Sequence, residues 1–236
     1  MLYEKNMMPK LIFKFDKEDD LKNIWKTCNT ESSYGYNWKN SVTDNIFKIC
    51  HGKKYATCKK ELEKTMRYIY KNPVINVIAE SFNKSWNTIR KDYFSKLEKI
   101  MKESFCSKEV IVYLTASQRC PYNPNKKNSS FHVNFFGGIP NILVTSGHEL
   151  MHIQFHNSKY WKICEKKLGN QKTHDLKEAL TILLNLEFHD LLINEDRVYP
   201  NHIQLRKFIK EQWKKEKDFD VLIDESIKWI KENGIK

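Results

Sequence analysis

Residues 142–156, ILVTSGHELMHIQFH, constrain the fold more than any other part of this 236-residue chain. The only acidic or basic residues in the stretch are one glutamate, Glu149, and three histidines, His148, His152 and His156. In a helix, Leu150 falls roughly on the side opposite the two histidines. We therefore expect a helix that packs on the core through its apolar face and offers its polar face to a site.

The spacing of the two histidines suits one metal ion. Residues four apart lie one above the other on a helix, so both imidazole rings can reach the same zinc ion. Glu149 projects along the edge of that face, where it can take a proton from a water held by the metal. The same letters also arise by chance as a pair of surface or core histidines. The uncharged neighbours, such as Thr145 and Met151, favour a buried site.

A catalytic zinc site needs a third protein ligand and one open position. His156 is a poor candidate, because eight residues along a helix amount to about 12 Å of rise. The apolar helix predicted over residues 175–193 is a better source. Glu178 lies in the middle of a polar strip on it, and buried polar groups need partners that a metal site supplies. Glu178 is the predicted third ligand, with Glu187 and His189 as alternatives.

HELMH and, after 25 intervening residues, the glutamate of KEAL resemble the gluzincin branch of the HExxH zinc metallopeptidases, or zincins. The resemblance covers about residues 131–190. It implies a bound Zn²⁺ with His148, His152 and Glu178 as ligands and Glu149 as general base. It also implies that FHVNFF, residues 131–136, is an edge strand against which an extended peptide pairs. The metzincin arrangement is excluded, because serine stands where its third histidine would be.

The chain departs from the thermolysin-like members of that branch at one position. They carry an aspartate four residues after the ligand glutamate, where it orients a ligand histidine, and this chain has Ile182 there. Asp175 or Asn185 could take that task. Gluzincins also supply an oxyanion donor from a tyrosine or histidine beyond the third ligand. Tyr199, slightly ahead of His202, is the candidate here, although both residues also suit an ordinary turn before a helix.

The rest of the chain predicts an α+β fold with a small sheet. Apolar spacing indicates a helical N-terminal half, with helices over residues 17–27, 57–70 and 74–105. EVIVYLT, residues 109–115, and FHVNFF are rich in β-branched or aromatic residues and predict strands. Two amphipathic helices are expected near residues 201–216 and 218–232. We expect residues 1–105 to form a mostly helical region of unknown role, and residues 106–236 a zincin-like catalytic region.

Charge and composition limit the partners. The formal charge of +12 favours acidic partners, but the lysines are spread along the chain and no nucleic-acid motif accompanies them. We therefore expect a peptide or protein substrate and no nucleic acid. No apolar run reaches the length of a membrane span, and the N-terminus is too polar for a signal peptide, which predicts a cytoplasmic protein without a membrane partner. Its six cysteines are then expected to be free thiols.

These observations predict a zinc metallopeptidase that hydrolyses peptide bonds with zinc-activated water and a glutamate general base. Two alternatives stay open. The first is a zincin-like metal-binding protein with a regulatory role and no peptidase activity, because its ligands would be the same. The second is a basic protein that binds nucleic acid. The sequence names neither a substrate nor an oligomeric state.

Overall fold

The computed structural model describes residues 8–31, 34–197 and 199–235. Residues 1–7, part of the N-terminal stretch considered above, lie outside the described residues. The strands are β1 (Lys10–Phe15), β2 (Glu109–Thr115), β3 (Tyr122–Asn123) and β4 (Ser130–Asn134). The α-helices are α1 (Lys17–Asn29), α2 (Asp44–Cys50), α3 (Tyr55–Tyr70), α4 (Val74–Met101), α5 (Gly138–Asn157), α6 (Lys159–Leu168), α7 (Asn170–Leu180), α8 (Ile182–Glu187), α9 (Ile203–Lys215) and α10 (Phe219–Asn233). Short 3-10 turns are η1 (Trp38–Ser41), η2 (Phe135–Gly137) and η3 (Pro200–His202).

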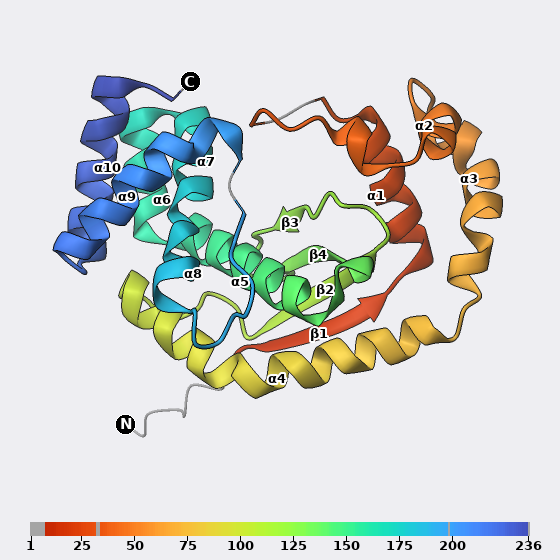
Figure 1. Ribbon diagram of the computed structural model, residues 1–236, viewed down its shortest axis with the longest axis horizontal. Coiled ribbons are helices and arrows are strands. Elements are labelled where there is room, and N and C mark those ends of the chain that lie inside the picture. Colours follow the sequence, from red (N-terminus) through yellow and green to blue (C-terminus); the bar gives the residue numbers. More distant parts are fainter. Residues whose placement is uncertain (1–7, 32–33, 198, 236) are drawn as a thin grey trace.

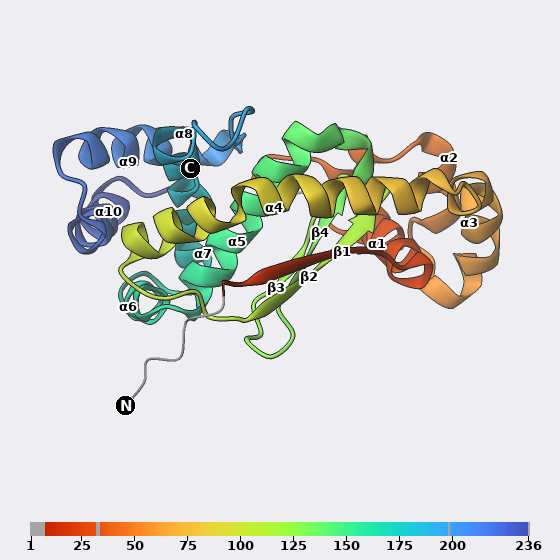
Figure 2. The same ribbon diagram turned by 90° about the horizontal axis from the view of Figure 1, so that it is seen from below.

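The fold is mixed α+β and mostly helical, as predicted, with one small sheet (Figure 1). The strands lie in the order β1-β2-β4-β3, with the first three parallel and β3 antiparallel to β4. Alternate strand residues are buried, as period-2 geometry requires. They are Leu11, Phe13, Val110, Val112, Leu114, Phe131 and Val133. Helices α4 and α5 lie on the same side of the sheet (Figure 2), and their apolar residues join these strand residues in the main core.

The predicted helices in the N-terminal half are present, but that half is not entirely helical. Residues 10–15 form β1, which pairs in parallel with β2. The short apolar run LIFKF alternates buried Leu11 and Phe13 with more exposed neighbours, which is strand periodicity. Through β1 and α4 the first hundred residues share the sheet and the main core with the rest of the chain. Helices α1, α2 and α3 enclose a second, smaller apolar cluster.

Two further predictions of local structure are wrong. FHVNFF is not an edge strand, because β4 pairs with β2 on one side and with β3 on the other. The edge on that side of the sheet is β3, a two-residue strand, and the other edge is β1. The helix predicted over residues 175–193 is divided at Thr181 into α7 and α8, and α8 already ends at Glu187.

None of the helices in the described ranges is both long enough and apolar enough to cross a bilayer. The six cysteines are unpaired, as predicted.

Candidate metal centre

The HELMH residues lie in the middle of α5, where the helix is locked against α4. The Tyr93 hydroxyl of α4 donates a hydrogen bond of 2.6 Å to the carbonyl of Gly147. A Cβ at Gly147 would stand 3.1 Å from the Tyr93 ring, so any other residue there would require the ring to shift by a few tenths of an ångström. On successive turns of α5, the rings of His148 and His152 have centroids 4.1 Å apart. Packing on α4 therefore fixes the helix face that presents the histidines.

Helix α7 brings Glu178 to the two histidines. Its Oε2 lies 3.4 Å from His148 Nε2 and 3.6 Å from His152 Nε2, and one donor atom from each of the three residues lies within 4.8 Å of the others. Bonds of about 2.1 Å in tetrahedral zinc sites separate the ligand atoms by about 3.4 Å. We call these three residues the metal triad. Its spacing matches that of a zinc site.

Two buried atoms at the centre have no hydrogen-bond partner among the described residues. They are Nε2 of His152 and Oε2 of Glu149. Unpartnered polar atoms in a protein interior are costly, and a bound cation with its water would satisfy both. Two imidazoles and one carboxylate are also a donor set that catalytic zinc uses. The residues present therefore fit zinc in the type and spacing of their donor atoms, and two of their buried polar atoms lack a hydrogen-bond partner that a bound ion and its water would supply.

Asp196, which lies between α8 and η3, orients His148. Its Oδ1 accepts a 2.8 Å hydrogen bond from His148 Nδ1, which leaves Nε2 to face the triad. Its Oδ2 accepts from Thr181 Oγ1 at 2.6 Å and from Arg206 Nη1 at 2.9 Å. Burial raises the pKa of Asp196, but the charges of His148 and Arg206 outweigh burial and hold that pKa below its usual value. Asp196 is thus an ionised carboxylate that fixes the ring and tautomer of His148.

Neither residue proposed for that orienting task contacts a ligand histidine. Asp175 instead accepts a hydrogen bond of 2.9 Å from His202 Nε2. Asn185 binds the backbone of Asp196, donating to its carbonyl at 3.1 Å and accepting from its amide at 2.7 Å. Asn185 therefore holds the residue that orients His148. Asp196 comes from an irregular segment, where no periodicity in the sequence could identify it.

A buried lysine completes the surroundings of Glu178. Lys177 is 3% exposed, and its Nζ lies 2.8 Å from Oε1 of Glu178 and 3.3 Å from the Tyr122 hydroxyl. The ammonium also lies 4.5 Å from the centre of the Tyr122 ring. Because Oε1 is held by Lys177, only Oε2 faces the histidines. Glu178 is thus arranged to bind a metal through one oxygen.

Glu149 lies beside the triad without belonging to it. Burial raises the pKa of its carboxyl to about 7; the charges of His148 and Lys177 oppose that rise, and Glu178 adds to it. A cation held by the triad would stabilise the carboxylate and lower this pKa. A carboxyl group whose pKa lies near neutrality can accept a proton and return it.

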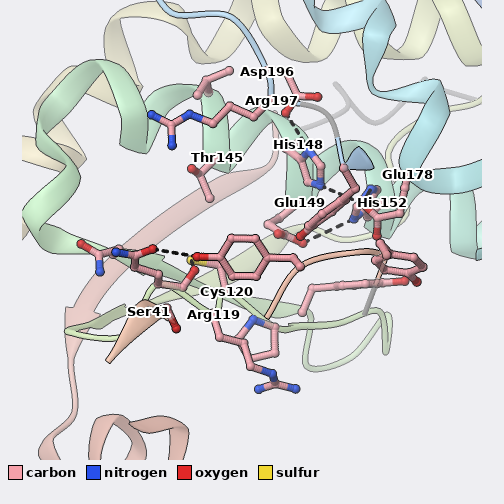
Figure 3. Close-up of a pocket in the computed structure, with 18 of the residues that line it drawn as sticks. Ser41, Arg119, Cys120, Thr145, His148, Glu149, His152, Glu178, Asp196 and Arg197 are labelled. Atoms are coloured by element: carbon pink, nitrogen blue, oxygen red, sulfur yellow. Dashed lines mark hydrogen bonds and ion pairs between the residues drawn. The ribbon is translucent and has the colours of Figure 1, made fainter. Parts of the chain in front are cut away.

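The triad and Glu149 line a cleft with a volume of about 910 Å³ (Figure 3). Tyr199 also lines it, and burial together with the charges of Glu178 and Glu149 raises its pKa above the ordinary value. His202 is 1% exposed, hydrogen-bonded to Asp175 and absent from the cleft lining, so the structure does not bring it to the centre.

The two alternative ligands also lie elsewhere. Glu187 accepts from Trp213 Nε1 and pairs with Lys217 Nζ, and His189 is exposed and does not line the cleft. The N-terminal region, whose role the sequence left open, supplies one wall through Tyr34, Tyr36 and Trp38. The centroids of the Tyr34 and Tyr199 rings are 5.2 Å apart, so the wall formed by the N-terminal region meets the side of the cleft that carries Tyr199.

The chain was compared with known protein families, curated proteins and solved structures. No protein-family model, no curated protein and no solved structure matches the chain.

Proposed function

We propose that this chain is a zinc-dependent peptidase that hydrolyses peptide bonds in a peptide or protein substrate. The observation that carries the proposal is the convergence of His148, His152 and Glu178 beside Glu149 in one cleft. A site that only held metal for structure would close all four positions with protein ligands. Here the triad supplies three, and the carboxylate of Glu149 adjoins the open side.

The residues have separate roles in this proposal. When bound, zinc would supply a Lewis acid that polarises the scissile carbonyl and lowers the pKa of water. Glu149 accepts the proton of the attacking water and passes it to the leaving nitrogen. Asp196 keeps His148 in the tautomer whose Nε2 faces the triad. Tyr199 is the proposed donor to the oxyanion, because it lines the same cleft.

The cleft also supports a place for an extended substrate. Residues 119–122 line it and lead into β3, the edge of the sheet. Sheet edges bind extended peptides by adding a strand. We therefore propose that substrate pairs along this edge, rather than along β4, which already has a neighbour on each side.

The test is zinc content by elemental analysis, combined with hydrolysis of a mixed peptide library. We expect one zinc per chain in the wild type, loss of zinc in Glu178→Ala, and unchanged zinc in Glu187→Ala, which alters a glutamate outside the centre. Glu149→Gln should keep zinc and lose at least about 100-fold in hydrolysis rate. A wild-type protein that binds no zinc after supplementation would remove the proposal. Zinc binding without any hydrolysis would instead favour the metal-binding protein with a regulatory role.

A further inference from the structure

Arg119 lies between β2 and β3 and lines the same cleft as the metal triad (Figure 3). Its side chain is half-buried. Its guanidinium makes one hydrogen bond to a side chain, from Nη1 to Asn23 Oδ1 at 3.3 Å. Among the described residues no carboxylate forms an ion pair with it. An arginine has five N–H donors in a rigid fork, so most of its bonding capacity is unused.

The other enclosed cations of the centre are all neutralised. Arg206 pairs with Asp196 at 2.9 Å, and Lys177 pairs with Glu178 at 2.8 Å. The ionisable groups that most affect Arg119 are Cys120 and Tyr199, which are neutral at physiological pH. Partial burial of a cation without a partner is unfavourable, and a ligand carboxylate would remove that cost. Among the described residues around the centre, Arg119 is therefore an enclosed positive charge without an ion-pair partner.

The surrounding structure holds Arg119 in place. Asn23 of α1, which is 3% exposed, donates from Nδ2 to the carbonyl of Arg119 at 2.9 Å and to Thr115 Oγ1 at 3.0 Å. The backbone amide of Arg119 donates to Ser117 Oγ at 3.1 Å. One buried amide thus fixes both the backbone and the guanidinium of Arg119. A group positioned in advance loses little entropy when a ligand binds.

Arg119 also differs from the other arginine of the cleft. Arg197 is exposed, and Glu195, an acid of opposite charge two residues away, lines the same cleft. In the view of Figure 3, Arg197 and Arg119 lie on opposite sides of the pair formed by His148 and Glu149. A substrate that crosses the centre therefore meets an exposed arginine with an acid two residues away on one side, and the half-buried Arg119 on the other.

We propose that Arg119 is a specificity residue that binds a carboxylate of the substrate in the cleft that contains the metal triad. This inference rests on the proposed peptidase function. The carboxylate comes either from an aspartate or glutamate side chain or from the C-terminus of the peptide. The guanidinium forks onto both oxygens, in the geometry that arginine prefers for carboxylates.

The experiment compares pools of short peptides that differ only in charge. One arm sets Glu against Gln at a fixed position, and the other sets a free C-terminus against a C-terminal amide. Hydrolysis is measured as kcat/KM for zinc-loaded wild type, Arg119→Gln, Arg119→Lys and Arg67→Gln, which removes an exposed arginine of α3 outside the cleft. We expect wild type and Arg67→Gln to prefer the charged peptides by about 10- to 100-fold in one arm, because hydrogen bonds between charged groups have that strength.

That preference should disappear in Arg119→Gln and return in part in Arg119→Lys, which keeps the charge but not the fork. The arm that shows it identifies the source of the carboxylate. Equal rates on charged and neutral peptides in both arms, or an undiminished preference in Arg119→Gln, would overturn the inference. Binding of the same peptide pools to zinc-loaded Glu149→Gln tests the carboxylate site independently of hydrolysis. It therefore separates failure of the carboxylate site from failure of the proposed peptidase function. Binding that depends on Arg119, without hydrolysis by wild type, would keep the carboxylate site and remove the peptidase.

Discussion

Two clusters of charged side chains in this molecule use similar residues in different surroundings. The buried cluster surrounds the metal centre and consists of His148, Lys177, Glu178, Asp196 and Arg206. The surface cluster joins α4, α6 and α10 and consists of Lys102, Lys159, Asp218 and Asp220. Ion-pair distances are alike, at 2.8–2.9 Å for Lys177–Glu178 and Arg206–Asp196 and 2.6–3.0 Å on the surface. Side chains of the first are at most 15% exposed, whereas those of the second are 34–55% exposed.

This difference in access to water decides what each cluster contributes. Removal of charges from water costs several kcal/mol per ion. When every partner is present, the attraction between opposite charges roughly balances that cost. Exposed pairs cost little to form and contribute little, because water and salt screen them. A buried cluster is therefore a weak source of stability but is sensitive to the loss of any member. Its place beside the triad indicates that it serves the site.

The largest expected difference between the clusters is in the response to Asp196→Asn. The change leaves the Arg206 guanidinium buried without a counter-charge and removes the charged acceptor for His148 Nδ1. We expect the free energy of unfolding to fall by about 3–5 kcal/mol. We also expect zinc affinity to fall about 10- to 100-fold, as is usual when the partner of a ligand histidine is lost.

Urea unfolding and a competitive zinc titration measure the two effects. Asp190→Asn is the matched control, because Asp190 pairs with Lys96 on the surface with its side chain 52% exposed. If both variants lose the same small stability, burial does not distinguish the two clusters.

Lys177→Met should give a smaller effect that depends on metal. Without metal, Lys177 is the nearest full positive charge to Glu178, so its loss leaves a buried carboxylate with only the histidines as partners. We expect the metal-free protein to lose about 2 kcal/mol of unfolding free energy. With saturating zinc the loss should shrink, because the ion supplies charge to Glu178.

Thermal unfolding with and without zinc measures this, and Lys172→Met, an exposed lysine on the same helix, is the control. A loss that is the same with and without zinc would mean that Lys177 and the metal do not act on a common group.

Helix geometry made the centre of the site predictable from sequence. The spacing of His148 and His152 is a property of one helix, and it holds wherever that helix packs. Glu178 was found because a carboxylate in a mostly apolar helix needs a partner. The structure brings these three side chains together.

The surroundings of the triad were not predictable in the same way. The prediction of one helix over residues 175–193 assumed a continuous helix, and the chain turns at Thr181 between α7 and α8. Asp196 is 48 residues from His148, and only tertiary packing joins them. Lys177 looks like a surface lysine in the sequence, since its burial depends on Tyr122 from the sheet edge. Strand β1 was missed because its apolar stretch is short and interrupted by Lys14.

The smallest expected effect is in the surface cluster. Hydrogen bonds from Lys102 lower the pKa of both Asp218 and Asp220 below their usual 3.8, and for Asp220 bonds from Lys159 and Tyr160 contribute as well. Because the folded pKa is depressed, the stabilisation is present above pH 3.8 and is lost as pH falls through the folded pKa. We expect Lys159→Gln, which removes one donor to Asp220, to change unfolding free energy at neutral pH by less than about 1 kcal/mol.

That change should become smaller in about 1 M salt, where the screening length is about 3 Å, and below the folded pKa of Asp220, where the aspartate is protonated. Urea unfolding of Lys159→Gln and wild type at neutral and acid pH, in low and high salt, measures it. The double variant Lys159→Gln with Asp220→Asn should lose no more than Asp220→Asn alone. A loss as large as that of Asp196→Asn, or one unaffected by salt and pH, would show that the surface pair is shielded from water despite its exposure. The contrast between the two clusters would then have to come from their partners instead of from burial.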